Sequence, residues 1–74
     1  MYDKIFDFEK SATTKDGKKG EKDAIKAIKK IETLDKDTIM DIMDSVYKRT
    51  TNTDYIAGFV DICRQAMMSI DIVA

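Results

Sequence analysis

Apolar side chains recur every three to four residues over most of the sequence after residue 20, which predicts amphipathic helices. The first predicted helix covers residues 21–34, "EKDAIKAIKKIETL", with Ile25 on the flank of its apolar side. The apolar side itself is formed by Ala24, Ala27, Ile28, Ile31 and Leu34. Lysines occupy the opposite side, so this helix is expected to bury one face and expose the other.

Two further helices follow the same spacing. Residues 38–49 place Ile39, Ile42, Met43, Val46 and Tyr47 on one stripe, and either Asp35 or Asp37 is a suitable N-cap. Residues 54–69 form the third helix, with Asn52 or Thr53 as the cap. Its stripe is broader and contains Ile56, Phe59, Val60, Cys63, Ala66, Met67 and Ile70. A stripe of this width predicts a central helix that contacts both neighbours.

The first 20 residues have no comparable pattern. Residues 2–10 carry four bulky apolar side chains, which predicts an N-terminal arm packed onto the domain. Residues 11–20, "SATTKDGKKG", are polar and contain the turn signal Asp16-Gly17, so we expect a flexible lysine-rich loop. The predicted organisation is therefore an arm (1–10), a polar loop (11–20) and an all-α three-helix bundle (21–74).

The composition restricts the class of protein. A chain of 74 residues is at most one domain, and a domain of this size is marginally stable alone. Its single cysteine excludes an intrachain disulfide and fits a reducing cytoplasm. No apolar run reaches the roughly 18 residues of a membrane helix, and the first residues do not resemble a signal peptide. We therefore expect a cytoplasmic protein without a membrane partner.

Candidate chemistry is sparse. The chain has no histidine, which removes the commonest general base and metal ligand. Cys63 lies in the middle of the apolar stripe, so we interpret it as a buried structural thiol. Asp41 and Asp44 are spaced i, i+3 but have no apolar pocket or basic neighbour, which indicates solvated carboxylates. We expect no catalytic residue, no metal site and no cofactor, and hence no enzymatic activity.

The strongest local feature is the lysine face formed by Lys22, Lys26, Lys29 and Lys30. Lysines spaced i, i+4 on a helix repel one another by a few tenths of a kcal/mol per pair, and an anionic partner would remove that repulsion. We favour an acidic protein surface. Nucleic acid is the alternative, but the net charge is −1 and the lysine face contains no arginine, the residue preferred for bidentate recognition. Solubility alone would also explain a lysine-rich surface.

Apolar residues outside the stripes predict a second contact surface. Met40 and Met68 lie off the main stripes, and methionine suits irregular binding surfaces. Beyond the third helix the chain remains apolar at Ile70, Ile72 and Val73. Because two short neighbouring helices offer little apolar area, we expect a second chain or a partner to cover residues 67–73. Self-association is thus a further alternative.

Residues 37–74 resemble the late-transcription co-activator family of large tailed bacteriophages. The matching positions are Tyr55, Ile56, Val60 and Cys63, followed by Ile70 and Ala74. The resemblance implies a small helical protein that binds the host RNA polymerase. It also implies contact with the DNA sliding clamp through an acidic-apolar segment similar in character to "SIDIVA". The expected function is therefore a non-enzymatic adaptor, regulator or inhibitor acting on a larger machine, and the resemblance implies a phage-encoded protein.

Overall fold

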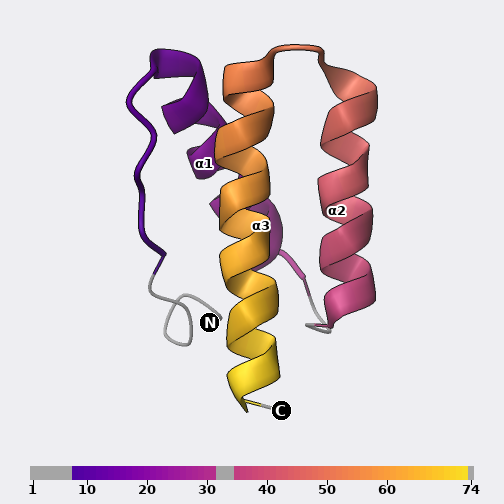
Figure 1. Ribbon diagram of the computed structural model, residues 1–74. Coiled ribbons are helices and arrows are strands. Elements are labelled where there is room, and N and C mark those ends of the chain that lie inside the picture. Colours follow the sequence, from indigo (N-terminus) through magenta and orange to yellow (C-terminus); the bar gives the residue numbers. More distant parts are fainter. Residues whose placement is uncertain (1–7, 32–34, 74) are drawn as a thin grey trace.

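The computed structural model describes residues 8–31 and 35–73, with only the backbone described for 71–73. This part of the chain contains α1 (Lys15–Lys29), α2 (Lys36–Arg49) and α3 (Thr53–Val73), and no strand. Helix α3 lies in the middle, packs against both α1 and α2, and runs antiparallel to α2 (Figure 1). The predicted all-α three-helix architecture with the third helix at its centre is confirmed.

Helix α1 begins earlier than the sequence pattern indicated. The prediction of a flexible loop over 11–20 is wrong from Lys15 onward, and a helix start at residue 21 is wrong by six residues. Thr14 caps the helix, since its Oγ1 accepts a hydrogen bond from Gly17 N at 3.0 Å and its carbonyl accepts one from Lys18 N. The helix ends at Lys29 rather than at residue 34, and Leu34 lies outside the described residues.

The two glycines that indicated a loop instead allow α1 to approach α3 closely. A Cβ atom on Gly20 would lie less than 3.0 Å from the carbonyl oxygen of Tyr55, and one on Gly58 would overlap the backbone of Gly17. Both contacts are with backbone atoms, which cannot rotate away. The helical conformation of residues 15–20 is therefore stabilised by packing on α3, which outweighs the low helix propensity of glycine.

Helix α2 begins at Lys36 with Asp35 as its N-cap, one of the two predicted caps. The Asp35 carboxylate accepts a hydrogen bond from Thr38 N at 2.7 Å, and this bond lowers the pKa of Asp35. Tyr47 was expected on the buried stripe but is 55% exposed. Because α2 packs chiefly on α3, its fully buried stripe is narrow and contains only Ile39 and Val46 among the described side chains.

Helix α3 begins after Asn52, whose Oδ1 accepts a hydrogen bond from Tyr55 N at 3.1 Å. It continues to Val73, so the predicted end at residue 69 is too early. The core forms around this helix. Its fully buried apolar side chains are Ala24, Ile28, Ile39, Val46, Phe59, Ile62, Cys63 and Ala66. Ile62 is not one of the residues of the predicted stripe and is completely buried.

The described part of the arm packs on the bundle, as predicted for residues 8–10, whereas residues 1–7 lie outside the described residues. Phe8 contacts the core cluster. Glu9 forms two backbone hydrogen bonds with the Gln65 side chain, because Glu9 N donates to Oε1 and Gln65 Nε2 donates to the Glu9 carbonyl, both at 2.8 Å. Gln65 lies outside the predicted apolar stripe of α3, and the arm half-buries it.

Over the described residues, no helix has an apolar stretch of the length and hydropathy that crossing a bilayer would require.

Candidate interaction surface between the arm and α1

Every lysine of α1 lies on one side of the helix. At 3.6 residues per turn, six lysines of the helix and the C-cap residue Lys30 fall within about 120° of its circumference. They are Lys15, Lys18, Lys19, Lys22, Lys26, Lys29 and Lys30, and each is exposed. The predicted lysine face (Lys22, Lys26, Lys29, Lys30) is therefore present and accessible, and the earlier helix start adds three lysines to it.

The acidic side chains of α1 do not neutralise these lysines. Asp16 accepts a hydrogen bond from Asn52 Nδ2 at 2.8 Å, and Asp23 accepts one from the Tyr55 hydroxyl. Glu21 is 3% exposed and accepts from the backbone N–H groups of Ser11 and Ala12, at 3.0 and 3.2 Å. Each carboxylate thus binds a neutral donor. Over the described residues, no lysine of α1 forms an ion pair.

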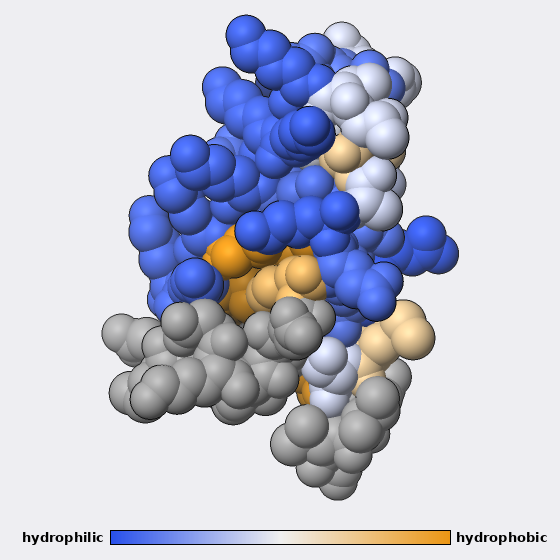
Figure 2. All heavy atoms as spheres, turned by 90° about the vertical axis from the view of Figure 1, so that its left-hand side faces the viewer, coloured by the Kyte–Doolittle hydropathy of each residue, from blue (hydrophilic) through white to orange (hydrophobic). Residues whose placement is uncertain are grey.

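A groove of about 510 Å³ lies between the arm and α1, beside the lysine face. Among the described residues, Ile25 and Ala12 supply its apolar surface, and Glu21 is the one carboxylate of its lining. Five lysines complete the lining: Lys10, Lys18, Lys22, Lys26 and Lys29. On the arm side of the molecule, Figure 2 shows a recessed apolar patch framed by hydrophilic residues. The groove therefore combines a small apolar floor with a cationic rim.

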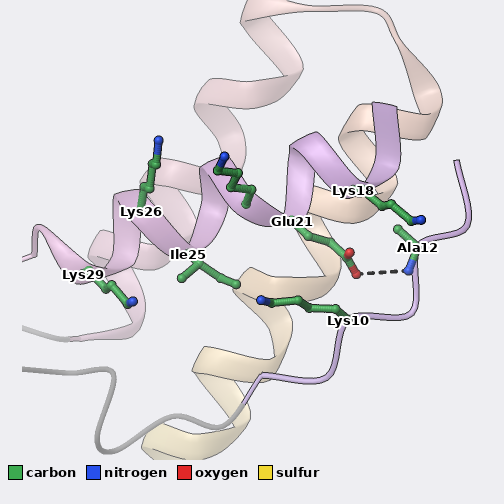
Figure 3. A pocket seen from close by; sticks show the side chains of 8 residues that line it. Lys10, Ala12, Lys18, Glu21, Ile25, Lys26 and Lys29 are labelled. Carbon is green, nitrogen blue, oxygen red and sulfur yellow. Dashed lines mark hydrogen bonds between the residues drawn. The ribbon is translucent and has the colours of Figure 1, made fainter. Parts of the chain in front are cut away.

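The lysines approach the groove from two segments. Lys10 extends from the arm across the groove toward Lys29 of α1, and Ile25 lies beside the two side chains (Figure 3). Glu21 points to the arm at Ala12, which fixes the distance between the two walls. Sequence analysis identified neither Lys10 nor Lys18 as a site residue. Lys18 precedes Lys22 by one turn, and a helix start at Lys15 would have placed it on the same face.

The other side of the arm has the opposite charge. A second groove of about 230 Å³ is lined by Glu21, Asp54 and Asp61, together with small residues of the arm and of the site where α1 and α3 approach each other at Gly17 and Gly58. None of its described lining residues is basic. The arm therefore separates a cationic groove from an anionic one. An extended polyanion that crossed the arm would be repelled by the carboxylates of the anionic groove.

A polar cluster joins the start of α1 to the turn between α2 and α3. The Arg49 guanidinium lies 5.6 Å from the centre of the Phe59 ring, and Tyr55 stacks on that ring at 6.1 Å between centroids. Burial and the hydrogen bond to Asp23 raise the pKa of Tyr55. These contacts connect all three helices, so we interpret the cluster as structural.

The predicted apolar contact residues differ in exposure. Met40 and Met68 are 47% and 65% exposed, whereas Ile70 is half-buried and packs against the core. The backbone of Ile72 and Val73 belongs to α3, and their side chains lie outside the described residues. The start of α2 and the end of α3 lie at the same end of the molecule, which places Met40 and Met68 toward that end (Figure 1).

Cys63 is completely buried, as the apolar stripe predicted. Desolvation raises the pKa of its thiol to about 12, which suppresses the nucleophilic thiolate. Over the described residues, no group of three or more potential metal ligands is present.

No protein-family model, curated protein or solved structure matches the chain.

Proposed function

We propose that the chain is a non-enzymatic binding protein of the cytoplasm, in which the lysine side of α1 contacts an acidic surface of a larger protein. One observation carries the proposal: the three carboxylates of α1 bind neutral donors, and the lysines remain without ion pairs over the described residues. Neighbouring lysines at i, i+4 repel one another, and an acidic partner removes this repulsion on binding.

A protein partner is favoured over nucleic acid for two structural reasons. The lysine side of α1 is about 22 Å long, but the acidic groove lies directly across the arm and would repel a polyanion extending past it. Among the described residues, the groove beside the lysines also has no aromatic lining residue on which a base would stack. A short acidic segment of a protein fits a basic surface of this extent.

The resemblance of residues 37–74 to phage late-transcription co-activators makes bacterial RNA polymerase the first partner to test. In this proposal the chain acts as an adaptor, regulator or inhibitor of a transcription complex. The resemblance rests on residues of α3 such as Tyr55, Val60 and Cys63, and all three also contribute to the packing of the bundle.

The test compares charge reversals on two helices. Lys26→Glu and Lys30→Glu together should preserve the helical circular dichroism and weaken binding of a fluorescent oligo-glutamate peptide, and of purified RNA polymerase if it is the partner, by about tenfold or more. Lys48→Glu is the matched control, since Lys48 is an exposed lysine on α2. If the parent binds a duplex DNA of about 20 base pairs at about 150 mM salt more tightly than the acidic peptide, with a steep loss as salt rises, the protein-partner proposal fails.

A second candidate function is self-association through the end of the molecule that carries Met40 and Met68. These are two of the three large apolar side chains that are exposed over the described residues, the third being Tyr47. Exposed apolar side chains that gather at one end favour a covered interface. A concentration-dependent increase in mass by analytical ultracentrifugation, abolished by Met68→Asp, would support this candidate, and a monomer at high concentration would exclude it.

A further inference from the structure

We infer that the groove between the arm and α1 selects acidic peptide segments that carry an apolar side chain, which packs on Ile25 between Lys10 and Lys29. This inference rests on the proposed function of the lysine side of α1 and names the class of ligand for it. A purely electrostatic contact would require only the lysines. The apolar floor is the additional feature that would give one acidic ligand a higher affinity than another.

The floor of the groove is apolar. Ile25 packs against the core on one side and lines the groove on the other, and Ala12 of the arm adds a second apolar surface. The aliphatic parts of the lysine side chains extend this surface, because lysine exposes its ammonium group while its stem covers apolar area. The volume of about 510 Å³ lies within the range of small-ligand pockets and is open to solvent. The floor therefore has room for at least one bulky apolar side chain.

Lysine ammonium groups surround this apolar floor. Lys10 and Lys29 come from different segments and extend toward the same region, while Lys18 and Lys26 lie further along the rim (Figure 3). A ligand side chain seated on Ile25 would therefore have ammonium groups on both sides of it. Carboxylates on the residues before and after that side chain would meet them. An acidic sequence with one embedded apolar residue matches this arrangement.

Hydrogen bonds within the chain preorganise the groove. Among the described residues that line the groove, Glu21 is the one carboxylate that could compete with the ligand, and its Oε2 atom accepts hydrogen bonds from the N–H groups of Ser11 and Ala12. The same hydrogen bonds hold the arm at a fixed distance from α1, and the two bonds between Gln65 and Glu9 hold the preceding residues on α3. Lys10 lies between these two anchors. The wall of the groove is thus formed before the ligand arrives, which lowers the entropy lost on binding.

The experiment measures the affinity of the full chain for two fluorescent peptides that differ at one position. The probes are Asp-Glu-Asp-Leu-Asp-Glu-Asp and the same peptide with serine in place of leucine, titrated by fluorescence anisotropy at about 100 mM salt. We expect the leucine peptide to bind about tenfold more tightly, because only its central side chain buries apolar area. Ile25→Ala should remove most of this preference. Ile56→Ala is the matched control, since Ile56 is also partly buried against the core and does not line the groove.

Lysine variants separate the electrostatic contribution to the peptide affinity from the apolar contribution. Replacing Lys10 and Lys29 by glutamine should weaken both peptides by a similar factor and keep the ratio of their affinities. Equal affinities of the parent for the two peptides would overturn the groove inference while leaving the proposed function intact. If neither peptide binds better than a neutral peptide of the same length, the proposed function fails as well. A leucine preference that is unchanged in Ile25→Ala would place the apolar contact elsewhere and also overturn the inference.

Discussion

The crossing of α1 and α3 gives the sharpest prediction for stability, through the substitution Gly58→Ala. In an exposed helix position this change would stabilise the helix by about 1 kcal/mol, because alanine has the higher helix propensity. At Gly58 the added methyl group would overlap the Gly17 carbonyl oxygen and lie 2.9 Å from the carbonyl carbon. Since the obstacle is backbone, the two helices must separate.

The magnitude follows from what the separation does to the core. Relieving the overlap requires an opening of about 1 Å, and a gap of that size forfeits about a quarter to a half of the dispersion attraction across it. Ala24 and Ile28 of α1 are completely buried and depend on this contact. Fully burying an isoleucine is worth about 1.5–3 kcal/mol, and overpacked cores lose about 1–3 kcal/mol. After subtracting the gain in propensity, we expect a net loss of about 2 kcal/mol.

The assay is urea and thermal unfolding followed by circular dichroism at 222 nm. A loss of about 2 kcal/mol in a domain of this size corresponds to a decrease in Tm of about 10 °C. Ala57→Gly is the control, because Ala57 is exposed and adjacent in α3, so it reports the propensity difference alone, about 1 kcal/mol. If Gly58→Ala is as stable as the parent or more stable, the close crossing described here is wrong.

Two further predictions concern the core and the arm. The Cys63 thiol should react with a bulky maleimide only after unfolding, and rapid labelling of the native chain would contradict its burial. Burial raises the pKa of Cys63 to about 12, so the native state retains a thiol proton that the unfolded state releases above about pH 9. The free energy of unfolding should therefore decrease as the pH rises from 9 to 10. Cys63→Ala should make this pH dependence weaker. Gln65→Leu removes both hydrogen bonds to Glu9, so it should accelerate amide exchange at Glu9 by NMR and cost about 1 kcal/mol. Arg64→Leu, an exposed neighbour on α3, is the control for this substitution, and unchanged exchange at Glu9 in Gln65→Leu would contradict the anchoring of the arm.

The sequence alone determined the features that depend on neighbours within one or two helical turns. The spacing of Ile39 and Val46 predicted α2, and the broad stripe around Phe59 and Cys63 predicted a central helix. The exposure of the lysine face followed from the same 3.6-residue period, because a side chain opposite an apolar stripe faces solvent whatever the stripe packs on. Asp35 and Asn52 were each one of two possible caps, since a cap requires only a local side-chain acceptor.

The tertiary structure alone decided the features that depend on residues far apart in the chain. Gly17 and Gly20 indicated a loop because glycine disfavours an isolated helix, and only the contact of Gly20 with the backbone of α3 at Tyr55 shows why the helix needs glycine at that position. Tyr47 matched the apolar period of α2 but is exposed, because no other part of the chain that the structure describes covers that side chain. The groove likewise requires an arm held by Glu21 and Gln65. These contacts join residues whose proximity no local pattern encodes. The groove and its lysines Lys10 and Lys18 therefore emerged from packing, whereas Lys22, Lys26 and Lys29 were predicted from the sequence.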